Sequence, residues 1–214
     1  MGVVRRPRRD PLRQGTEGAV AVDSVRGMLN PYSPYAEPGF DAWKEALQAL
    51  SPSEVSIRKA APTAQDGRWM RWMQADCEST NIHSAEDNVS KIAQQHVWLA
   101  EIADYPVGFC CVLAGQTDSA PLFIQLVAVV PSARRRGVGL ALLSAAARWQ
   151  PQRNIAMATL DDNVDARRLN ECFAQSIGGN IQRVPISRFR PSDLGFVRGE
   201  RHRPWLIDRQ QEAR

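Results

Sequence analysis

The sequence predicts an α+β protein in which helices and strands mix along one chain of 214 residues. Short apolar runs rich in Val, Ile and Leu alternate with segments whose apolar residues recur at helical spacing. One strand-like run, LFIQLVAVV at 122–130, passes through a proline and a glycine-containing loop into the helix-like LALLSAAARWQ at 140–150. Another strand-like run follows at 154–160. This strand–helix–strand unit predicts a right-handed parallel crossover.

The first part of the chain is organised differently from the rest. Residues 1–36 are rich in Arg, Pro, Gly and Tyr and have no sustained period, so we expect a basic, flexible N-terminal arm. In the lead-in segment 37–54, four apolar residues recur at helical spacing, namely Phe40, Trp43, Leu47 and Leu50. They predict a short helix that packs on the main domain, which we expect to span 55–210.

The first half of the main domain predicts a strand, two helices and a hairpin. In order, these lie at 55–57, from Pro62 to Cys77, at 84–92, and at 96–103 with 107–114. Ser84, with Asp87 three residues later, predicts a capping box at the start of the second helix. Asp104-Tyr-Pro between the last two strands indicates the hairpin turn.

The second half predicts three more strands around two helices. After the strand at 122–130 come a helix ending near Gln150, a strand at 154–160, a helix that follows Asn163, and strands at 181–186 and 204–208. The last helix carries one apolar face, formed by Leu169, Cys172, Phe173 and Ile177. Gly178-Gly179 ends it, because glycine is the usual residue just past a helix C-terminus.

Charge is unevenly distributed along the chain. The net charge is +4, but from Pro131 onward there are fifteen arginines and no lysine against eight carboxylates. Residues 51–130, in contrast, are net acidic. The second half is therefore where we expect an anion to bind.

Other features narrow the class of protein. The four cysteines include no C-x-x-C pair, which is typical of a reducing compartment, and no histidine has metal-ligand spacing, so we expect no metal site. No run approaches the ~18 apolar residues of a membrane span, and no apolar export core follows the N-terminal arginines. We expect a soluble cytoplasmic protein.

The loop between the run at 122–130 and the following helix has the composition of a phosphate-binding turn. It reads Arg134-Arg-Arg-Gly137-Val-Gly139. Glycines let backbone N–H groups close around phosphate oxygens, and the helix N-terminus adds a positive dipole end worth about 0.3–1 kcal/mol. Arginines supply charge and forked donors. The loop therefore predicts an anionic, polyphosphate-bearing ligand.

With this loop after the fourth strand, the chain resembles the GNAT superfamily of acyl-CoA-dependent N-acetyltransferases. The family signature is Gln or Arg, two residues, Gly, one residue, and Gly or Ala, which Arg134, Gly137 and Gly139 match. A second family pattern on the next helix is met by Asn163, Ala166 and Leu169, and the resemblance covers roughly 56–208. It implies a central, mostly antiparallel sheet with the parallel crossover at the cofactor site.

The resemblance also implies acetyl-CoA as cosubstrate and a set of binding residues. Backbone N–H groups of 135–140 would hold the diphosphate, and the pantetheine arm would run along 127–129 where the strands at 122–130 and 154–160 splay apart. N–H groups there would polarise the thioester carbonyl. The implied set is Val127, Ala128, Val129, Arg134, Arg135, Arg136, Gly137, Val138, Gly139, Leu140 and Asn163.

Proton transfer is where the chain departs from the family. Many members carry a tyrosine seven residues after the equivalent of Asn163, but here that residue is Asn170, and Phe123 stands where some histone-type members have a glutamate base. The candidates that we name for catalysis are Asn170 and Glu101.

Other side chains leave alternatives open. Asp76 and Glu78 are further candidate bases, although each carboxylate could equally be a solvated surface group. His202 is either a base near the thioester or a surface residue. Trp69 and Trp72 either line an acceptor pocket or pack in the core. The sequence is also consistent with an enzyme that has no dedicated general acid, because a thiolate is a tolerable leaving group near neutral pH.

The sequence thus predicts an N-acetyltransferase that moves an acetyl group from acetyl-CoA to a primary amine of a small molecule or a protein. The alternative is a CoA-binding module with weak or no catalysis, whose basic arm binds nucleic acid or a partner protein. A third possibility is modification of a nucleobase amine. The acceptor and the oligomeric state carry no motif.

Overall fold

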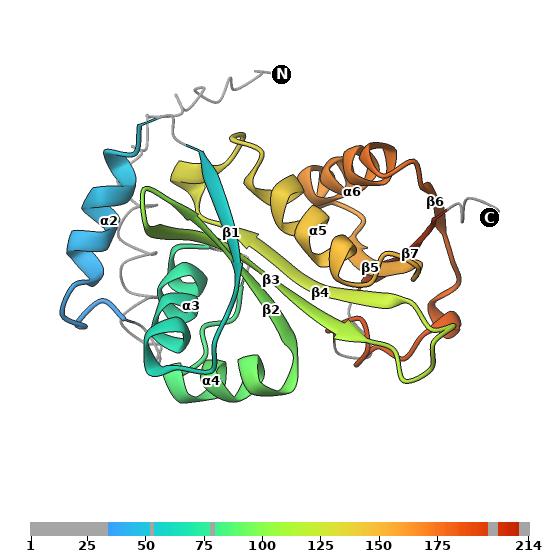
Figure 1. Cartoon of the computed structure of the whole chain (residues 1–214), viewed down its shortest axis with the longest axis horizontal. Coiled ribbons are helices and arrows are strands. Elements are labelled where there is room, and N and C mark those ends of the chain that lie inside the picture. Colours follow the sequence, from blue (N-terminus) through green and yellow to red (C-terminus); the bar gives the residue numbers. More distant parts are fainter. Residues whose placement is uncertain (1–33, 52–53, 78–79, 197–200, 210–214) are drawn as a thin grey trace, which may run out of the picture.

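A computed structural model describes residues 34–51, 54–77, 80–196 and 201–209 (Figure 1). Most of the arm predicted at 1–36 therefore lies outside the described residues. Within the described ranges the strands are β1 Val55–Lys59, β2 His96–Ile102, β3 Tyr105–Ala114, β4 Leu122–Val129, β5 Ile155–Leu160, β6 Asn180–Arg183 and β7 His202–Asp208. The α-helices are α2 Phe40–Gln48, α3 Ala64–Asp76, α4 Ala85–Gln94, α5 Val138–Trp149 and α6 Val164–Ser176. The same ranges contain two short 3-10 helices, η1 Pro131–Ala133 and η2 Ile186–Arg188.

The described strands form one mixed sheet in the order β1-β2-β3-β4-β5-β7-β6. Neighbouring strands pair antiparallel, with one parallel pair, β4 with β5, in this part of the chain. Helix α5 joins those two strands, so the predicted parallel crossover and the predicted fold class are confirmed. Parallel neighbours need such a helical connection because a tight turn cannot reverse the chain between them.

Helices cover both faces of the sheet. His96 of β2 stacks on Trp149 of α5, with ring centroids 3.6 Å apart. Arg58 of β1, which pairs with Leu99 of β2, contacts Asp66 of α3. Successive strand residues point to opposite faces, so positions 96 and 99 place α5 and α3 on opposite sides. Figure 1 shows α6 beside α5, and α4 beside α3.

Local sequence explains where most elements begin and end. The predicted cap of α4 is confirmed, because the Ser84 hydroxyl accepts a hydrogen bond of 3.0 Å from the Asp87 N–H. The predicted hairpin turn was misplaced by one or two residues. Ala103 and Asp104 have φ of 49° and 65° and form the turn themselves, and Pro106 lies within β3. The ladder shifts register there, and a bulge is one of the few strand positions that tolerate proline.

Helix α2 is packed into the core of the described structure. Phe40, Trp43 and Leu47 are at most 4% exposed and belong to the same apolar cluster as the sheet and α5. The Trp43 indole N–H donates to the Pro106 carbonyl at 3.1 Å. The expected lead-in helix therefore forms and packs as predicted, while the domain boundaries at 36, 54 and 210 stay predictions.

This packing generates a stability prediction. Trp43→Ala removes a buried ring and a buried hydrogen bond, so it should lower the free energy of unfolding by about 3–5 kcal/mol in urea denaturation. Glu45→Ala, an exposed change on the same helix, should stay within about 0.5 kcal/mol. Equal effects of the two substitutions would show that α2 does not belong to the cooperative core.

Candidate functional site

Strand β4 leaves its parallel partner after three residues. Pairing with β5 joins positions 122–124 to 155–157 and goes no further, although β4 continues to Val129. At that point β4 contains one extra residue, because Cys111 of β3 faces Leu126 while Val112 faces Ile124. Gln125 is therefore a bulge, and a bulge bends its strand and raises the local twist. Beyond Ile124, β4 has an edge that no β5 residue pairs.

The hydrogen-bond pattern identifies which main-chain groups face that open edge. The Val130 N–H donates to the Val107 carbonyl of β3 at 3.0 Å. Successive residues of a strand point their main-chain groups to opposite edges, so Ala128 also faces β3, whereas Val127 and Val129 face away from it. Consistently, the Val129 carbonyl accepts from Arg134 Nε at 3.2 Å.

The loop after β4 delivers an open helix N-terminus next to this edge. Gly137 caps α5 with φ 78° and ψ 0°, and no side chain caps the helix. The first intrahelical donor is Ala141, which bonds the Gly137 carbonyl, so the N–H groups of 138–140 have no helical acceptor. A Cβ at Gly137 would meet nothing within 4 Å. The space beside Gly137, at the start of α5, is therefore open.

The three arginines of the loop are arranged differently from one another. Arg134 turns back to the Val129 carbonyl and lies beside Cys77. Arg136 donates to the carbonyls of Leu50 and Ser51, both at 3.0 Å. Arg135, with φ 62°, is exposed and makes no hydrogen bond or ion pair with any described residue. Arg135 is thus the loop arginine whose side chain is available to an anion.

The second sequence pattern positions α6 against α5. The Asn163 side-chain oxygen accepts from the Ala166 N–H at 2.9 Å and caps α6. A Cβ at Gly139 would lie 3.0 Å from a Leu169 methyl, so glycine permits the close approach of the two helices. These contacts explain Asn163, Ala166 and Leu169 structurally, and a coenzyme contact by Asn163 stays a prediction.

Asn170, one of the two predicted catalytic residues, lies on α6 with only 7% of its surface exposed. Its amide has no hydrogen-bond partner among the described residues. An amide can donate a hydrogen bond but cannot supply a proton at neutral pH, so Asn170 can orient a group but not act as an acid.

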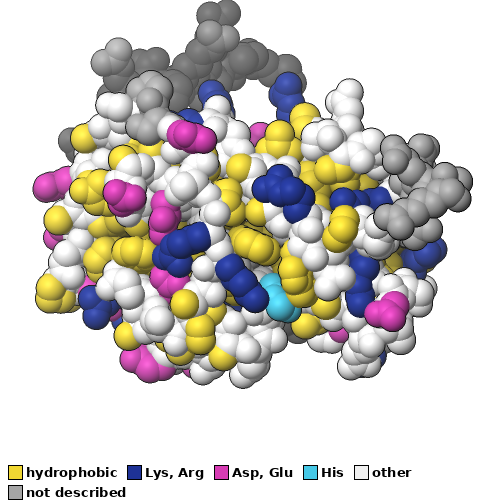
Figure 2. Space-filling model, viewed as in Figure 1, with side chains coloured by type: hydrophobic (Ala, Val, Ile, Leu, Met, Phe, Trp, Pro, Cys, Tyr) yellow, Lys and Arg dark blue, Asp and Glu magenta, His cyan; other side chains and the backbone are white. Residues whose placement is uncertain are grey.

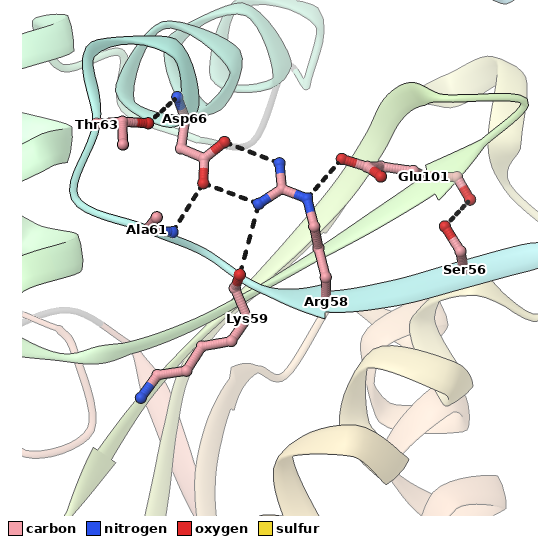
Figure 3. Close-up of polar contacts among 7 residues, drawn as sticks. All are labelled: Ser56, Arg58, Lys59, Ala61, Thr63, Asp66 and Glu101. Carbon is pink, nitrogen blue, oxygen red and sulfur yellow. Dashed lines mark hydrogen bonds and ion pairs between the residues drawn. The ribbon is translucent and has the colours of Figure 1, made fainter.

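Glu101, the other predicted catalytic residue, is held in an ion-pair network that Figure 3 shows. Arg58 Nε donates to Glu101 at 2.8 Å, while both Arg58 terminal nitrogens bond Asp66 at 2.8 and 2.9 Å. The Ala61 N–H also donates to Asp66. Glu101 therefore ties β2 to β1 and, through Arg58, to α3, and its role as a base stays a prediction.

The structure also places most of the other side chains for which the sequence left two roles open. Asp76 pairs with Lys44 at 2.9 Å, and Glu78 lies outside the described ranges. Trp72 is a core residue, since it is 6% exposed and packs on Phe40 and Trp43. The ring of His202 stacks on Phe196 with centroids 4.9 Å apart.

The cysteines divide into three buried and one exposed. Cys77, Cys110 and Cys111 are buried, and burial raises the pKa of Cys77 to about 12 and that of Cys111 to about 11. The expectation that Cys172 lies on the apolar face of α6 was wrong, because its side chain is exposed. The apolar face of α6 centres on Phe173 and Ala174. Phe173 is rotated about 100° around the helix axis from Cys172.

Sequence reasoning missed the role of Gln125. Its side-chain amide donates to the carbonyls of Ser192 and Asp193 at 3.0 and 3.1 Å. This anchors the 184–196 segment, whose Leu194 and Phe196 form a second small core with Phe123 and other residues of the sheet. The available signal was a lone polar residue inside the apolar run LFIQLVAVV.

An open groove of about 510 Å³ runs between β1 and α5. Its lining combines Val55 and Ile57 with Leu140, Ser144 and Arg148, and it ends at Gly137. Figure 2 shows several Lys and Arg side chains beside apolar surface on the face that α5 occupies.

Among the described residues no group of three or more His, Cys, Asp or Glu could hold a metal ion. No helix in the same ranges has the length and apolar character of a membrane span.

Comparison with known proteins identifies the same region of the chain. Residues 67–172 match the model of the acetyltransferase (GNAT) family. No curated protein matches. A solved structure of diaminobutyrate acetyltransferase from Paenibacillus lautus, in complex with L-2,4-diaminobutyric acid and coenzyme A, is 20% identical with a TM-score of 0.57, covering 73% of this chain and 95% of its own.

Two further solved structures agree with that likeness. A GNAT-family acetyltransferase from Bacillus cereus is 16% identical with a TM-score of 0.56, over 74% of this chain and 100% of its own. An acetyltransferase from Streptococcus agalactiae is 14% identical with a TM-score of 0.54, over 71% and 96%. At these identities the structures establish the shared fold.

The Arg58 network predicts a pH-dependent contribution to stability. Burial acts to raise the pKa of Asp66, but hydrogen bonds from Arg58 and the Ala61 N–H outweigh it and hold the pKa below the ordinary 3.8. A lowered folded-state pKa favours folding above the ordinary value, and this contribution is lost as the pH falls through the folded value. Asp66→Asn should therefore cost about 1–3 kcal/mol at pH 7.

The difference between wild type and Asp66→Asn should shrink below pH 3.8, because the carboxyl of the unfolded wild type is then protonated, and it should vanish as the pH falls through the lower pKa of the folded state. Urea denaturation at pH 7 and pH 3 measures both values. Asp162→Asn, an exposed change, serves as control and should alter neither. A cost that is the same at both pH values would contradict a charged Asp66 in the folded state.

Proposed function

We propose that this member of the GNAT acetyltransferases transfers an acetyl group from acetyl-CoA to a primary amine of a small molecule or a protein. One observation carries the proposal: the uncapped N-terminus of α5 lies next to the unpaired edge of β4. The N–H groups at the start of α5, which suit a diphosphate, therefore lie beside the main-chain groups of β4, which suit the extended, amide-bearing pantetheine arm. That combination is what an acyl-CoA needs.

The residues present fit the coenzyme at both ends of the site. The free N–H groups of 138–140 bind the diphosphate, and the open space at Gly137 leaves room for it. The exposed Arg135 supplies charge. Along β4, Val127 and Val129 offer main-chain groups to the pantetheine arm, while Ala128, which faces β3, is proposed to line the site only by packing.

The coenzyme supplies an activated thioester, and the chain supplies orientation and electrostatic stabilisation. A β4 N–H at the open edge donates to the thioester carbonyl, where negative charge grows during attack by the amine. Asn170 stays as a positioning proposal for a hydrogen bond near this point. The proposal requires no carboxylate base: the amine attacks in its neutral form, the C–N bond replaces the C–S bond, CoA leaves as the thiolate, and the proton released from nitrogen goes to water.

The acceptor is proposed only as a class, a primary amine. The structure of the Paenibacillus lautus enzyme holds a diamino acid, but a 20% identical neighbour carries no substrate assignment to this chain. The alternative of a CoA-binding module with weak catalysis draws support from one observation, the absence of an assigned acid or base at Asn170 and Glu101. Nucleic-acid binding by the arm, together with the cytoplasmic location, stays a prediction from sequence.

The direct test combines binding and turnover. Calorimetry with CoA and a thiol-release assay over a panel of primary amines should both respond to the wild type, with a no-acceptor blank because Cys172 is exposed. Coenzyme binding without turnover on any amine would favour the binding module. Neither binding nor turnover would end the proposal.

Gly137→Glu tests the position of the diphosphate. A carboxylate in front of the α5 N-terminus repels the ligand, so CoA affinity should fall by at least ~100-fold in calorimetry. Gly178→Glu is a matched control, since Gly178 also has a positive φ of 64° and open space at its Cβ. Both changes carry a similar backbone cost of about 1–2 kcal/mol, but only the first should weaken binding. Equal binding by the two variants would contradict the placement.

A further inference from the structure

We infer that Arg136 is a positioning residue that ties the coenzyme loop to helix α2, so that a helix outside the matched residues 67–172 supports the coenzyme site. The inference rests on the proposed function for the identity of the ligand. It assigns the second of two basic roles in the loop: Arg135 meets the anion, and Arg136 holds the loop that presents the amides.

The tether consists of two hydrogen bonds from one guanidinium. Arg136 Nη1 donates to the Ser51 carbonyl and Nη2 to the Leu50 carbonyl, each at 3.0 Å. These carbonyls follow directly after α2, which is capped at Ala49. Both carbonyls lie beyond the C-cap, so no N–H of the helix bonds them, and a main-chain carbonyl is a suitable acceptor for arginine. The planar fork bonds both carbonyls at once.

The other end of the tether is fixed in the core. Phe40 and Trp43 of α2 are buried, and the Trp43 indole donates to the Pro106 carbonyl at 3.1 Å. Lys44 of α2 pairs with Asp76 of α3 at 2.9 Å. Leu50, whose carbonyl receives Arg136, itself packs against the main core. The tether therefore joins the loop to a rigid element.

The loop needs such support because its backbone is unusual. Arg135 and Gly137 both have positive φ, at 62° and 78°, on either side of Arg136. A left-handed conformation is unfavourable for a residue with a side chain and persists where the surroundings hold it. The N-terminal end of the loop is held by Ala133, which is fully buried at the end of η1. Helix α2 also contacts η1. The hydrogen bonds of Arg136 fix the C-terminal end of the loop, immediately before the amides of 138–140.

The roles of Arg135 and Arg136 separate in an experiment on salt dependence. Calorimetry with CoA is run at low salt and at about 0.5 M salt, where exposed charges are screened within a few ångströms. Arg135→Gln should weaken binding at low salt, and the defect should shrink at high salt. Arg136→Gln should weaken binding about tenfold at both, because it disturbs the geometry of neutral amides. Arg68→Gln, an exposed change on α3 at the opposite face of the sheet, should match wild type.

Two further readouts distinguish positioning from general stability. Pantetheine, which lacks the diphosphate, should bind wild type and Arg136→Gln equally. Arg136→Lys keeps the positive charge but loses the planar fork. Its CoA affinity should therefore lie between that of wild type and that of Arg136→Gln. Wild-type CoA affinity in Arg136→Gln, with or without a lowered melting temperature, would overturn the inference, as would an equal loss for pantetheine.

Failure of the proposed function can be recognised separately. If wild type binds no CoA, the proposed function fails, and the tether is judged by hydrogen exchange without ligand. Amides of 134–140 should then exchange faster in Arg136→Gln than in wild type or Arg68→Gln. Unchanged exchange in that loop would overturn the tether itself.

Discussion

The extra residue at Gln125 is the constraint from which the candidate site follows. It bends β4 away from β5 after three paired residues and leaves the main-chain groups of Val127 and Val129 unpaired by the sheet. A sheet that stayed paired along its whole length would have no such groups to offer. The bulge is itself held in place, because the Gln125 side chain anchors the 184–196 segment.

Three separate parts of the chain converge on this opening. The loop after β4 brings the uncapped start of α5 beside the open edge. Helix α2, far away in sequence, reaches the same loop through Arg136. The 184–196 segment covers the sheet next to the bulge and adds a small core of its own, which includes Phe123. The site is therefore built by long-range contacts around a short local motif.

The local motif was predictable from sequence and the long-range contacts were not. The strand, the loop and α5 could be predicted because apolar periodicity and glycine placement are local properties of the sequence, whereas Asn163 was identified through the family resemblance. The direction taken by Arg136 could not be predicted, since it depends on carbonyls that lie 85 and 86 residues away in the chain. The ion pair of Glu101 was not predicted for the same reason: its partner Arg58 lies 43 residues away.

The central claim is that neutral main-chain amides at the start of α5 and along the open edge of β4 receive the coenzyme. Amide NMR of the labelled protein titrated with CoA tests it most directly. We expect the largest shifts at residues 138–140, with further shifts at Val127 and Val129, and only the latter pair should respond to pantetheine. Saturable CoA binding that leaves all five amides unshifted would contradict the account.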